Sequence, residues 1–240
     1  MLTCRKVIKD FGGVRALAGI NVEIHEGEIV GLVGPNGSGK STLIETIMGQ
    51  YVPTSGQIEF LGKDITGQPP HKINRMGIAR TYQIPRPFVT MTALENVEVS
   101  ALFGRGENAN HMNATNEAQR WLEYTGMVAY ASQPVGKLNL HQRKFLELAR
   151  ALATHPRLLL LDEVMAGLNP SEVDESVEMI RKVHASGVTI VIVEHLMRVV
   201  TKLSTRMVVL HEGSVIAQGS PQEVMREPLV VSAYLGKDYA

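Results

Sequence analysis

One stretch of the sequence decides the fold, and it reads Gly34-Pro35-Asn36-Gly37-Ser38-Gly39-Lys40-Ser41. It follows the compact apolar run of residues 28–33 and precedes a helical pattern that begins with Thr42. A glycine-rich turn that joins a strand to a helix and ends in Lys-Ser is typical of a phosphate-binding loop, or P-loop. The glycines let backbone N–H groups turn toward phosphate oxygens. Lys40 adds a charge for the β- and γ-phosphates, and Ser41 offers a hydroxyl to Mg²⁺.

A pair of acids follows another apolar run. Residues 158–161 are leucines, and Asp162 and Glu163 come directly after them. A carboxylate at the C-terminal end of a buried parallel strand lies at the sheet edge where ligands bind. Asp162 suits Mg²⁺, usually through water, and Glu163 suits a general base that aligns an attacking water. Two acids after a strand are, taken alone, most often a solvated strand end, but a P-loop in the same chain favours the functional interpretation.

The apolar runs of the chain predict an α/β fold. Three runs are apolar at nearly every position, at residues 28–33, 158–161 and 189–193. Such runs are typical of central strands in a parallel sheet that helices cover on both faces. Helical patterns separate them, and one helix has a clear start signal: Asn169 as N-cap, Pro170 at the first position and Glu172 completing a box-like pattern.

Other parts of the chain read differently from this core. Residues 1–25 and 55–65 alternate like antiparallel strands, whereas residues 91–136 lack β-branched runs and read as mainly helical, with a polar break at residues 104–113. We therefore predict an α/β P-loop core with a parallel sheet, an N-terminal antiparallel β-subdomain and a helical subdomain inserted at roughly residues 91–150. We expect all 240 residues to form a single domain.

Composition argues against several classes of protein. The chain carries 24 Lys and Arg against 24 Asp and Glu, whereas binding to nucleic-acid phosphates usually shows as a basic excess. Cys4 is the single cysteine, which excludes an internal disulfide and a Cys-rich zinc site. No apolar run approaches the ~20 residues of a membrane-spanning helix, and the N-terminus lacks the h-region of a secretory signal. We therefore expect a soluble, intracellular protein that does not bind nucleic acid.

Further positions fall in a set order around the two strong motifs. Phe11 precedes Gly-Gly, Gln83 ends Arg-Thr-Tyr-Gln, residues 166–169 read Ala-Gly-Leu-Asn, and His195 ends Ile-Val-Glu-His. In this order the chain resembles the ATP-binding cassette (ABC) family. The resemblance implies that Phe11 stacks on adenine, that Gln83 contacts Mg²⁺, water and a membrane partner, and that His195 holds the γ-phosphate. Residues 166–169 resemble the family's D-loop.

The resemblance also implies a complete nucleotide site. The catalytic residues would be Glu163, His195 and Lys40, and Mg²⁺ would be held by Ser41, Gln83 and Asp162. The nucleotide itself, ATP, would be bound by Phe11, Gly34, Pro35, Asn36, Gly37, Ser38, Gly39, Lys40, Ser41, Thr42, Gln83, Asn139 and Gln142.

One motif departs from the family pattern. The family signature Leu-Ser-Gly-Gly-Gln corresponds here to Leu138-Asn139-Leu140-His141-Gln142. In the family this motif covers the γ-phosphate of ATP bound to the other subunit, and Asn139 can still donate a hydrogen bond at a helix N-terminus. Leu140 and His141 remove both glycines and their backbone freedom. Either the loop makes the same contact with another geometry or the composite site is weakened, and the sequence leaves both open.

Looser similarity narrows the group within the family. Residues 11–17, 77–83, 166–170 and 233–236 resemble the ATPase subunits of branched-chain or hydrophobic amino-acid importers. This implies an ATPase that pairs with a second cassette, identical or paralogous. Transmembrane permease subunits would hold it at the cytoplasmic face of the membrane, as a peripheral subunit that works indirectly with a solute-binding protein. Pro85, Pro87 and Phe88 are candidates for lining the permease groove, with a turn around a packed Phe as an equal alternative.

Other functions compete with this interpretation. Related cassettes serve the import of urea, amides or aromatic acids, and nothing in this chain contacts the solute. A regulatory ABC protein that binds ATP but hydrolyses it poorly is a second alternative, suggested by the altered signature. The presence of Glu163 and His195 argues against it, because a pure binder needs neither. A nucleic-acid or ribosome-directed ABC protein is disfavoured by the single cassette and the balanced charge.

Overall fold

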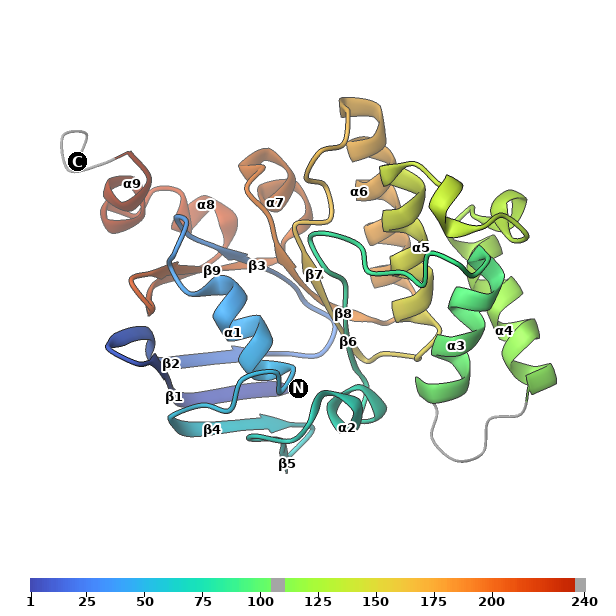
Figure 1. Cartoon of the computed structure of the whole chain (residues 1–240). Coiled ribbons are helices and arrows are strands. Elements are labelled where there is room, and N and C mark those ends of the chain that lie inside the picture. The colour runs from blue at the N-terminus through green and yellow to red at the C-terminus, as the bar shows by residue number, and fades with distance from the viewer. Residues whose placement is uncertain (105–110, 236–240) are drawn as a thin grey trace. The chain divides into compact units, whose positions relative to one another are not determined.

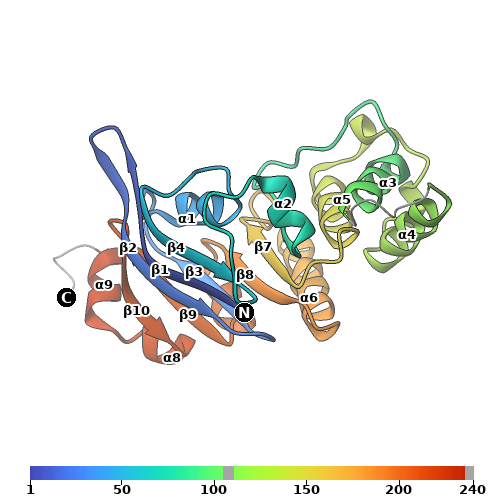
Figure 2. The same ribbon diagram turned by 90° about the horizontal axis from the view of Figure 1, so that it is seen from below.

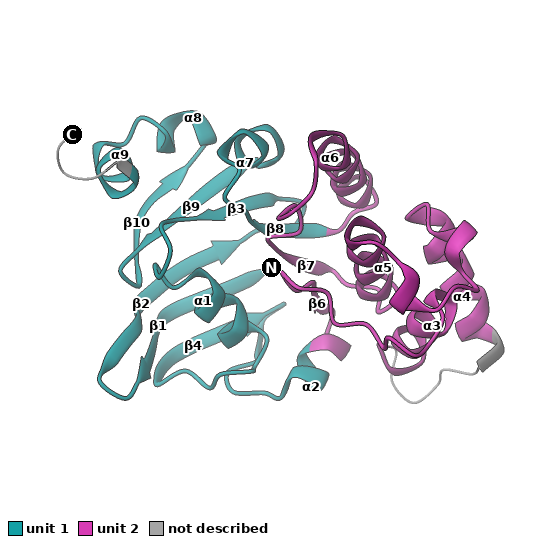
Figure 3. Cartoon of the chain, turned by 45° about the horizontal axis from the view of Figure 1, so that its top comes forward, with its two compact units in different colours: residues 1–73, 189–240 teal, residues 74–188 magenta. Residues whose placement is uncertain are grey.

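The computed structural model describes residues 1–104 and 111–235 of the chain (Figure 1). The chain forms two compact units, one made of residues 1–73 and 189–240 and the other of residues 74–188 (Figure 3). Helix α2 (Pro70–Arg75) spans the boundary between them in sequence. Among the described helices, none has the length and the apolar character that a membrane crossing requires.

The first unit contains an antiparallel sheet of order β2-β1-β4-β5. Figure 2 shows β2, β1 and β4 side by side. Its strands are β1 (Leu2–Phe11), β2 (Val14–Ile24), β4 (Ser55–Phe60) and β5 (Lys63–Asp64). The turn between β1 and β2 contains Gly12 at φ 55°, a left-handed conformation that glycine adopts without strain. This sheet confirms the antiparallel strands expected in residues 1–25 and 55–65.

The parallel strands of the first unit lead into the P-loop. β3 (Ile29–Val33) pairs in parallel with β8 (Thr189–Val193) on one side and with β9 (Arg206–His211) on the other, and β10 (Ser214–Gly219) adds to β9 antiparallel. Every residue of β3 and β8 is buried, which explains why both strands are apolar at nearly every position. The helices of this unit are α1 (Lys40–Ile47), α7 (Met197–Leu203), α8 (Pro221–Val224) and α9 (Pro228–Leu235).

The second unit combines two parallel strands with helices. β6 (Ile78–Arg80) pairs with β7 (Leu158–Asp162). The helices are α3 (Ala93–Gly104), α4 (His111–Tyr124), α5 (Leu140–Leu152) and α6 (Pro170–Ala185), with short 3₁₀ turns η1 (Val128–Tyr130) and η2 (Val135–Lys137). α3, α4 and α5 share one apolar cluster that includes Val97, Leu122 and Leu146. The helical character expected for residues 91–136 is therefore confirmed for residues 91–104 and 111–136, which the structure describes.

Three further predictions concern the start of α6, the polar break at residues 104–113 and the division into domains. α6 begins as predicted: the Asn169 side chain accepts a hydrogen bond from the Glu172 N–H, the Glu172 side chain accepts one from the Asn169 N–H, and Pro170 opens the helix. Most of the predicted polar break at 104–113 falls on residues outside those that the structure describes. The division into a single domain with a helical insertion stays a prediction.

Candidate active site

The P-loop lies between β3 and α1, and the packing around it tolerates only glycine at two of its positions. Gly34 has φ 150°, and a Cβ atom there would lie 2.1 Å from the carbonyl oxygen of Leu210. Gly39 has φ 104°, and its Cβ would lie 2.7 Å from the carbonyl oxygen of Ala16. A side chain at either position would displace backbone that belongs to neighbouring strands. The loop is thus shaped by its contacts with the sheets as well as by its own sequence.

The loop presents hydrogen-bond donors that suit a polyphosphate. Lys40 is buried, and its Nζ atom donates to the carbonyl oxygens of Gly34 at 2.8 Å and Pro35 at 2.9 Å. α1 begins at Lys40 with Gly39 as its N-cap, and glycine offers no side chain to cap the first N–H groups of the helix. Ser38 is buried, and its Oγ atom has no hydrogen-bond partner among the described residues. These features fit phosphate oxygens as the missing acceptors.

Phe11 and His195 lie in the same unit as the P-loop. Phe11 ends β1 at the tip of the hairpin, with 40% of its surface exposed. His195 follows β8 and precedes α7, and its side chain is also exposed. Ser41 and Thr42 are the second and third residues of α1. The first unit therefore holds the residues expected to contact adenine and phosphate.

In the second unit, Asp162 forms a buried ion pair that the sequence did not predict. Asp162 is the last residue of β7, and its Oδ2 atom lies 3.2 Å from Nη2 of Arg80 on the neighbouring strand β6. Their side chains are only 10% and 5% exposed. Removing two charges from water is costly, and the cost is offset only when each charge keeps its partner. The pair therefore makes the acidic end of β7 dependent on Arg80.

Glu163 lies next to Gln83 in a strained backbone conformation. The Nε2 atom of Gln83 donates a hydrogen bond to Oε2 of Glu163, which brings together two residues 80 positions apart in the sequence. Glu163 has φ 46°, a left-handed conformation that costs a non-glycine residue free energy and is concentrated at functional sites. The amide oxygen of Gln83 is left as an acceptor, which suits a Mg²⁺ ligand.

Two buried charged residues on α5 form hydrogen bonds to the segments that contain Gln83 and Glu163, and sequence reasoning missed both. The Nζ atom of Lys144 donates to the carbonyl oxygens of Glu163 at 3.3 Å and Ala166 at 2.7 Å. The carboxylate of Glu147 accepts hydrogen bonds from the N–H groups of Tyr82 and Arg86, on either side of the Gln83 segment. The available signal was their spacing: charges three residues apart among leucines on one helix face are unusual unless they are paired.

Glu147→Gln is expected to lower the free energy of unfolding by about 1–3 kcal/mol, because glutamine has one acceptor oxygen for two backbone N–H groups. Burial raises the pKa of Glu147, and the hydrogen bonds from Tyr82 and Arg86 offset part of this rise. The folded protein therefore holds the proton more tightly than the unfolded chain. The contribution of Glu147 to stability therefore falls as pH rises from the ordinary glutamate pKa of about 4.3 to the raised value, and the variant lacks this contribution.

Urea denaturation of both proteins across this pH interval tests the prediction. The stability difference between wild type and Glu147→Gln should narrow as pH rises, and a difference that widens contradicts the assignment. Glu178→Gln is the control, because Glu178 lies on the exposed side of α6 in a surface pair with Arg181 at 3.1 Å. Such pairs contribute about 0.2–1 kcal/mol.

The altered signature motif forms an ordinary helix start. Asn139 is the N-cap of α5, and its side chain and that of Gln142 each accept a hydrogen bond from the other's backbone N–H at 2.9 Å. The side-chain NH₂ groups of both residues remain as donors. Leu140 and His141 are the first two helical residues, so the conformation does not require the glycines that the family usually has.

The two residues that replace those glycines contact neighbouring elements. A Cβ atom on Gly167 would lie 3.1 Å from Cδ2 of Leu140, so the missing side chain of Gly167 leaves room for the leucine. The His141 ring packs against Phe145 with centroids 4.5 Å apart, and its Nε2 atom lies 3.5 Å from Oε2 of Glu175 on α6. The signature segment is thereby attached to the D-loop segment and to α6.

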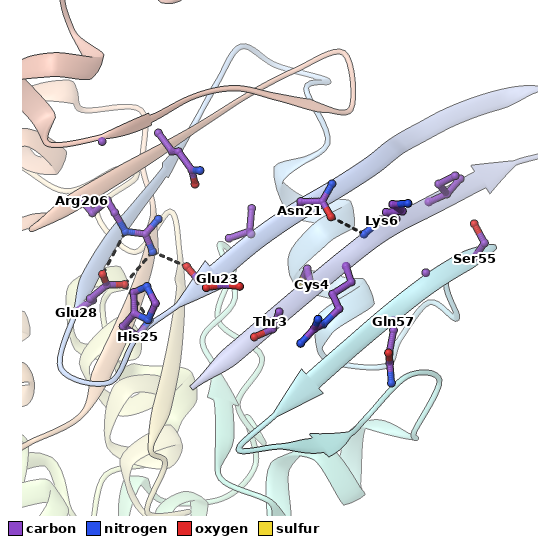
Figure 4. A pocket seen from close by; sticks show the side chains of 16 residues that line it. Thr3, Cys4, Lys6, Asn21, Glu23, His25, Glu28, Ser55, Gln57 and Arg206 are labelled. Atoms are coloured by element: carbon purple, nitrogen blue, oxygen red, sulfur yellow. Dashed lines mark hydrogen bonds and ion pairs between the residues drawn. The ribbon is translucent and has the colours of Figure 1, made fainter.

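One hollow of the first unit is lined by residues outside the P-loop. It has a volume of about 1170 Å³ and is lined by residues of β1, β2 and β4 together with Arg206 and Gln218 (Figure 4). Arg206 pairs with Glu28 at 2.9 Å, and Arg5 pairs with Glu59 at 3.3 Å. Burial raises the pKa of the Cys4 thiol to about 12, so it is not a nucleophile near neutral pH.

The chain belongs to the ABC transporter family. Residues 17–166 match the family described as ABC transporter, and residues 214–240 match the family described as branched-chain amino acid ATP-binding cassette transporter. Over 95% of its length, the chain is 38% identical to the high-affinity branched-chain amino acid transport ATP-binding protein BraF of Pseudomonas aeruginosa, of which 94% is covered. It is 36% identical over 99% of its length to the protein LivG of Escherichia coli, with the same description and 98% covered.

Solved structures agree with this assignment. A nucleotide-free ATP-binding cassette from an ABC transporter aligns with a TM-score of 0.89 at 31% identity, with 99% of each chain covered. The ADP conformation of an ABC transporter cassette gives a TM-score of 0.87 at 31% identity, again with 99% of each chain covered. A dimeric post-hydrolysis cassette bound to ADP and Pi gives 0.83 at 26% identity, over 92% of this chain and 99% of the other. The predicted family and fold class are confirmed, whereas the roles of individual residues stay predictions.

Proposed function

We propose that this protein is the ATP-hydrolysing subunit of an importer for branched-chain or other hydrophobic amino acids. Membership of the ABC family and full-length similarity to branched-chain amino acid transport ATP-binding proteins support the transport class. The main observation in favour of ATP hydrolysis is the hydrogen bond between Gln83 and Glu163. Glu163 directly follows the buried Asp162, and the same chain contains a complete P-loop motif. A protein that only binds ATP needs no residue to orient water.

In this proposal, the predicted site residues bind ATP and hydrolyse it. The N–H groups at the start of α1 and the Lys40 ammonium bind the phosphates, and Phe11 stacks on the base. Glu163 accepts a proton from the attacking water, whose oxygen bonds to the γ-phosphorus while the bond to the β–γ bridging oxygen breaks, giving ADP and phosphate. His195 donates a hydrogen bond to the γ-phosphate.

A magnesium ion fits the donor set of this proposal. Ser41, Gln83 and Asp162 would hold it with a hydroxyl, an amide and a carboxylate oxygen, all of which are hard ligands. When bound, it would neutralise charge on the β- and γ-phosphates. Among the described residues no group of three or more His, Cys, Asp or Glu could hold a metal. This agrees with a site that relies on phosphate oxygens and water for its remaining ligands.

The proposed partners follow from the family. A second cassette, identical or paralogous, would place its ATP against the donors of Asn139 and Gln142 at the start of α5. Permease subunits would bind the segment after Gln83, where Ile84 and Phe88 are 76% and 46% exposed. This segment is fastened to α5 through Glu147, so movement of a permease would reach the signature helix. The protein would then lie at the cytoplasmic face of the membrane, bound to the permease subunits. A solute-binding protein would be an indirect partner.

Uptake in the source cell tests the proposed function. Deletion of the gene for this protein is expected to abolish high-affinity uptake of labelled leucine, isoleucine and valine. The wild-type gene is expected to restore this uptake. Lys40→Ala is the control for ATP dependence and should not restore it. Loss of urea, amide or aromatic-acid uptake in place of leucine uptake would identify the alternative importers. Unchanged uptake of every solute, with ATP bound but not hydrolysed by the purified chain, would favour the regulatory protein.

A further inference from the structure

The Phe11 ring belongs to an aromatic pair with Tyr51. The two ring centroids lie 4.9 Å apart at an interplanar angle of 81°, an edge-to-face contact. Edge-to-face pairs are favourable because the positive ring edge meets the negative face of its neighbour. Phe11 is 40% exposed, so part of its surface remains open to a ligand. Tyr51 therefore restrains a ring that would otherwise extend from a hairpin tip.

Lys9 adds a cation to this pair. Its Nζ atom lies 4.8 Å from the Phe11 centroid and 5.8 Å from the Tyr51 centroid, within the range of a cation–π interaction. The same atom donates to the carbonyl oxygen of Val52 at 2.9 Å.

Two further hydrogen bonds join β1 to the segment that follows Tyr51. The Thr54 N–H donates to the Ile8 carbonyl oxygen at 2.7 Å, and the Asp10 N–H donates to Thr54 Oγ1 at 2.9 Å. The segment after Tyr51 is thus fastened to the strand that ends in Phe11.

Tyr51 is also connected to the helix that follows the P-loop. Its backbone N–H donates to the carbonyl oxygen of Glu45, which lies on α1 five positions after Lys40. Glu45 raises the pKa of the Tyr51 hydroxyl through its charge and by accepting the hydrogen bond of that hydroxyl. A short helix is a rigid connection, so Tyr51 relates the position of the Phe11 ring to that of the Lys40 ammonium.

We propose that Tyr51 is a positioning residue that holds the Phe11 ring as a preformed platform for the base of the nucleotide, at a set distance from the phosphate loop. The inference rests on the proposed function, in which Phe11 stacks on adenine. A platform that is already ordered spares the free energy of fixing an exposed side chain when the nucleotide binds. We expect this to strengthen nucleotide binding by about three- to tenfold.

Calorimetric titration of the full chain with ATP and with inorganic tripolyphosphate tests the role of Tyr51. Tyr51→Ala is expected to weaken ATP binding by three- to tenfold and to leave tripolyphosphate binding unchanged, because tripolyphosphate has no base. KM for ATP should rise while kcat at saturation is kept. Tyr51→Phe keeps the ring pair but loses the hydroxyl contact with Glu45, so it should weaken ATP binding less than Tyr51→Ala. Val14→Ala, at the exposed position opposite Phe11 in the hairpin, is the matched control.

Phe11 variants separate failure of this inference from failure of the proposed function. If Tyr51 acts through Phe11, the double variant Phe11→Ala with Tyr51→Ala should bind ATP no more weakly than Phe11→Ala alone. Unchanged ATP binding in Tyr51→Ala, together with weakened binding in Phe11→Ala, overturns the inference and leaves the Phe11 platform in place. Equal weakening of ATP and tripolyphosphate in Tyr51→Ala also overturns it, because the effect then lies in the P-loop. Unchanged ATP binding in Phe11→Ala removes the base platform from the proposed function itself.

Discussion

Glu163→Gln is expected to retain ATP binding and to lower steady-state ATP turnover by roughly 10²- to 10⁴-fold, the contribution of a positioned general base. Glutamine has nearly the same shape as glutamate, and its amide oxygen can still accept the hydrogen bond from Gln83. It cannot accept the proton of the attacking water, however. The variant should therefore accumulate as an ATP-bound dimer, because the nucleotide that holds two cassettes together is no longer consumed.

Phosphate release and size-exclusion chromatography with ATP measure the two parts of this prediction. The control is Glu212→Gln, since Glu212 is a second glutamate with a left-handed backbone, at φ 48° in the turn between β9 and β10. It separates the loss of the base from any effect of replacing a glutamate in that conformation. Undiminished turnover in Glu163→Gln would show that another group activates the water.

Arg80→Met is expected to lower the free energy of unfolding by about 3–5 kcal/mol, because it removes the guanidinium that lies 3.2 Å from the buried carboxylate of Asp162. Methionine is of similar length and apolar, so the loss measures the charge more than the packing. The effect should be larger than that of any surface pair in the chain. Urea denaturation at neutral pH measures it.

Two comparisons sharpen the Arg80 prediction. Arg181→Met removes an exposed ion pair with Glu178 and should cost about 0.2–1 kcal/mol. The double variant Arg80→Met with Asp162→Leu should recover stability relative to Arg80→Met alone, because the buried carboxylate is then removed together with the guanidinium that faces it. A cost below about 1 kcal/mol for Arg80→Met would show that Asp162 is solvated or otherwise paired in solution.

The sequence predicted those features that depend only on residues close together along the chain. The P-loop is a contiguous run whose glycines and Lys-Ser ending state its chemistry, and the cap of α6 is decided within four residues by Asn169 and Glu172. β3 and β8 are apolar at nearly every position because both of their faces are buried. Such runs can be recognised in the local sequence alone. These local patterns were sufficient for the fold class and the family.

Only the tertiary structure decided which side chains support the site. Arg80 reaches Asp162 across 82 positions and Glu147 reaches Tyr82 across 65, so no local pattern relates them. The same holds for Tyr51 beside Phe11, which the hydrogen bonds between two distant segments bring together.

The sequence by itself therefore predicted the chemistry of the site: a phosphate loop, an acid suited to Mg²⁺ and an acid suited to a general base. The tertiary structure decided how that chemistry is held, because a buried charge or an exposed ring acquires its partner only when the chain closes on itself. It also answered part of the question that the signature motif left open. Leu140 and His141 begin α5 without strain because Asn139 and Gln142 cap that helix, so the missing glycines do not prevent the signature segment from folding as a helix N-terminus.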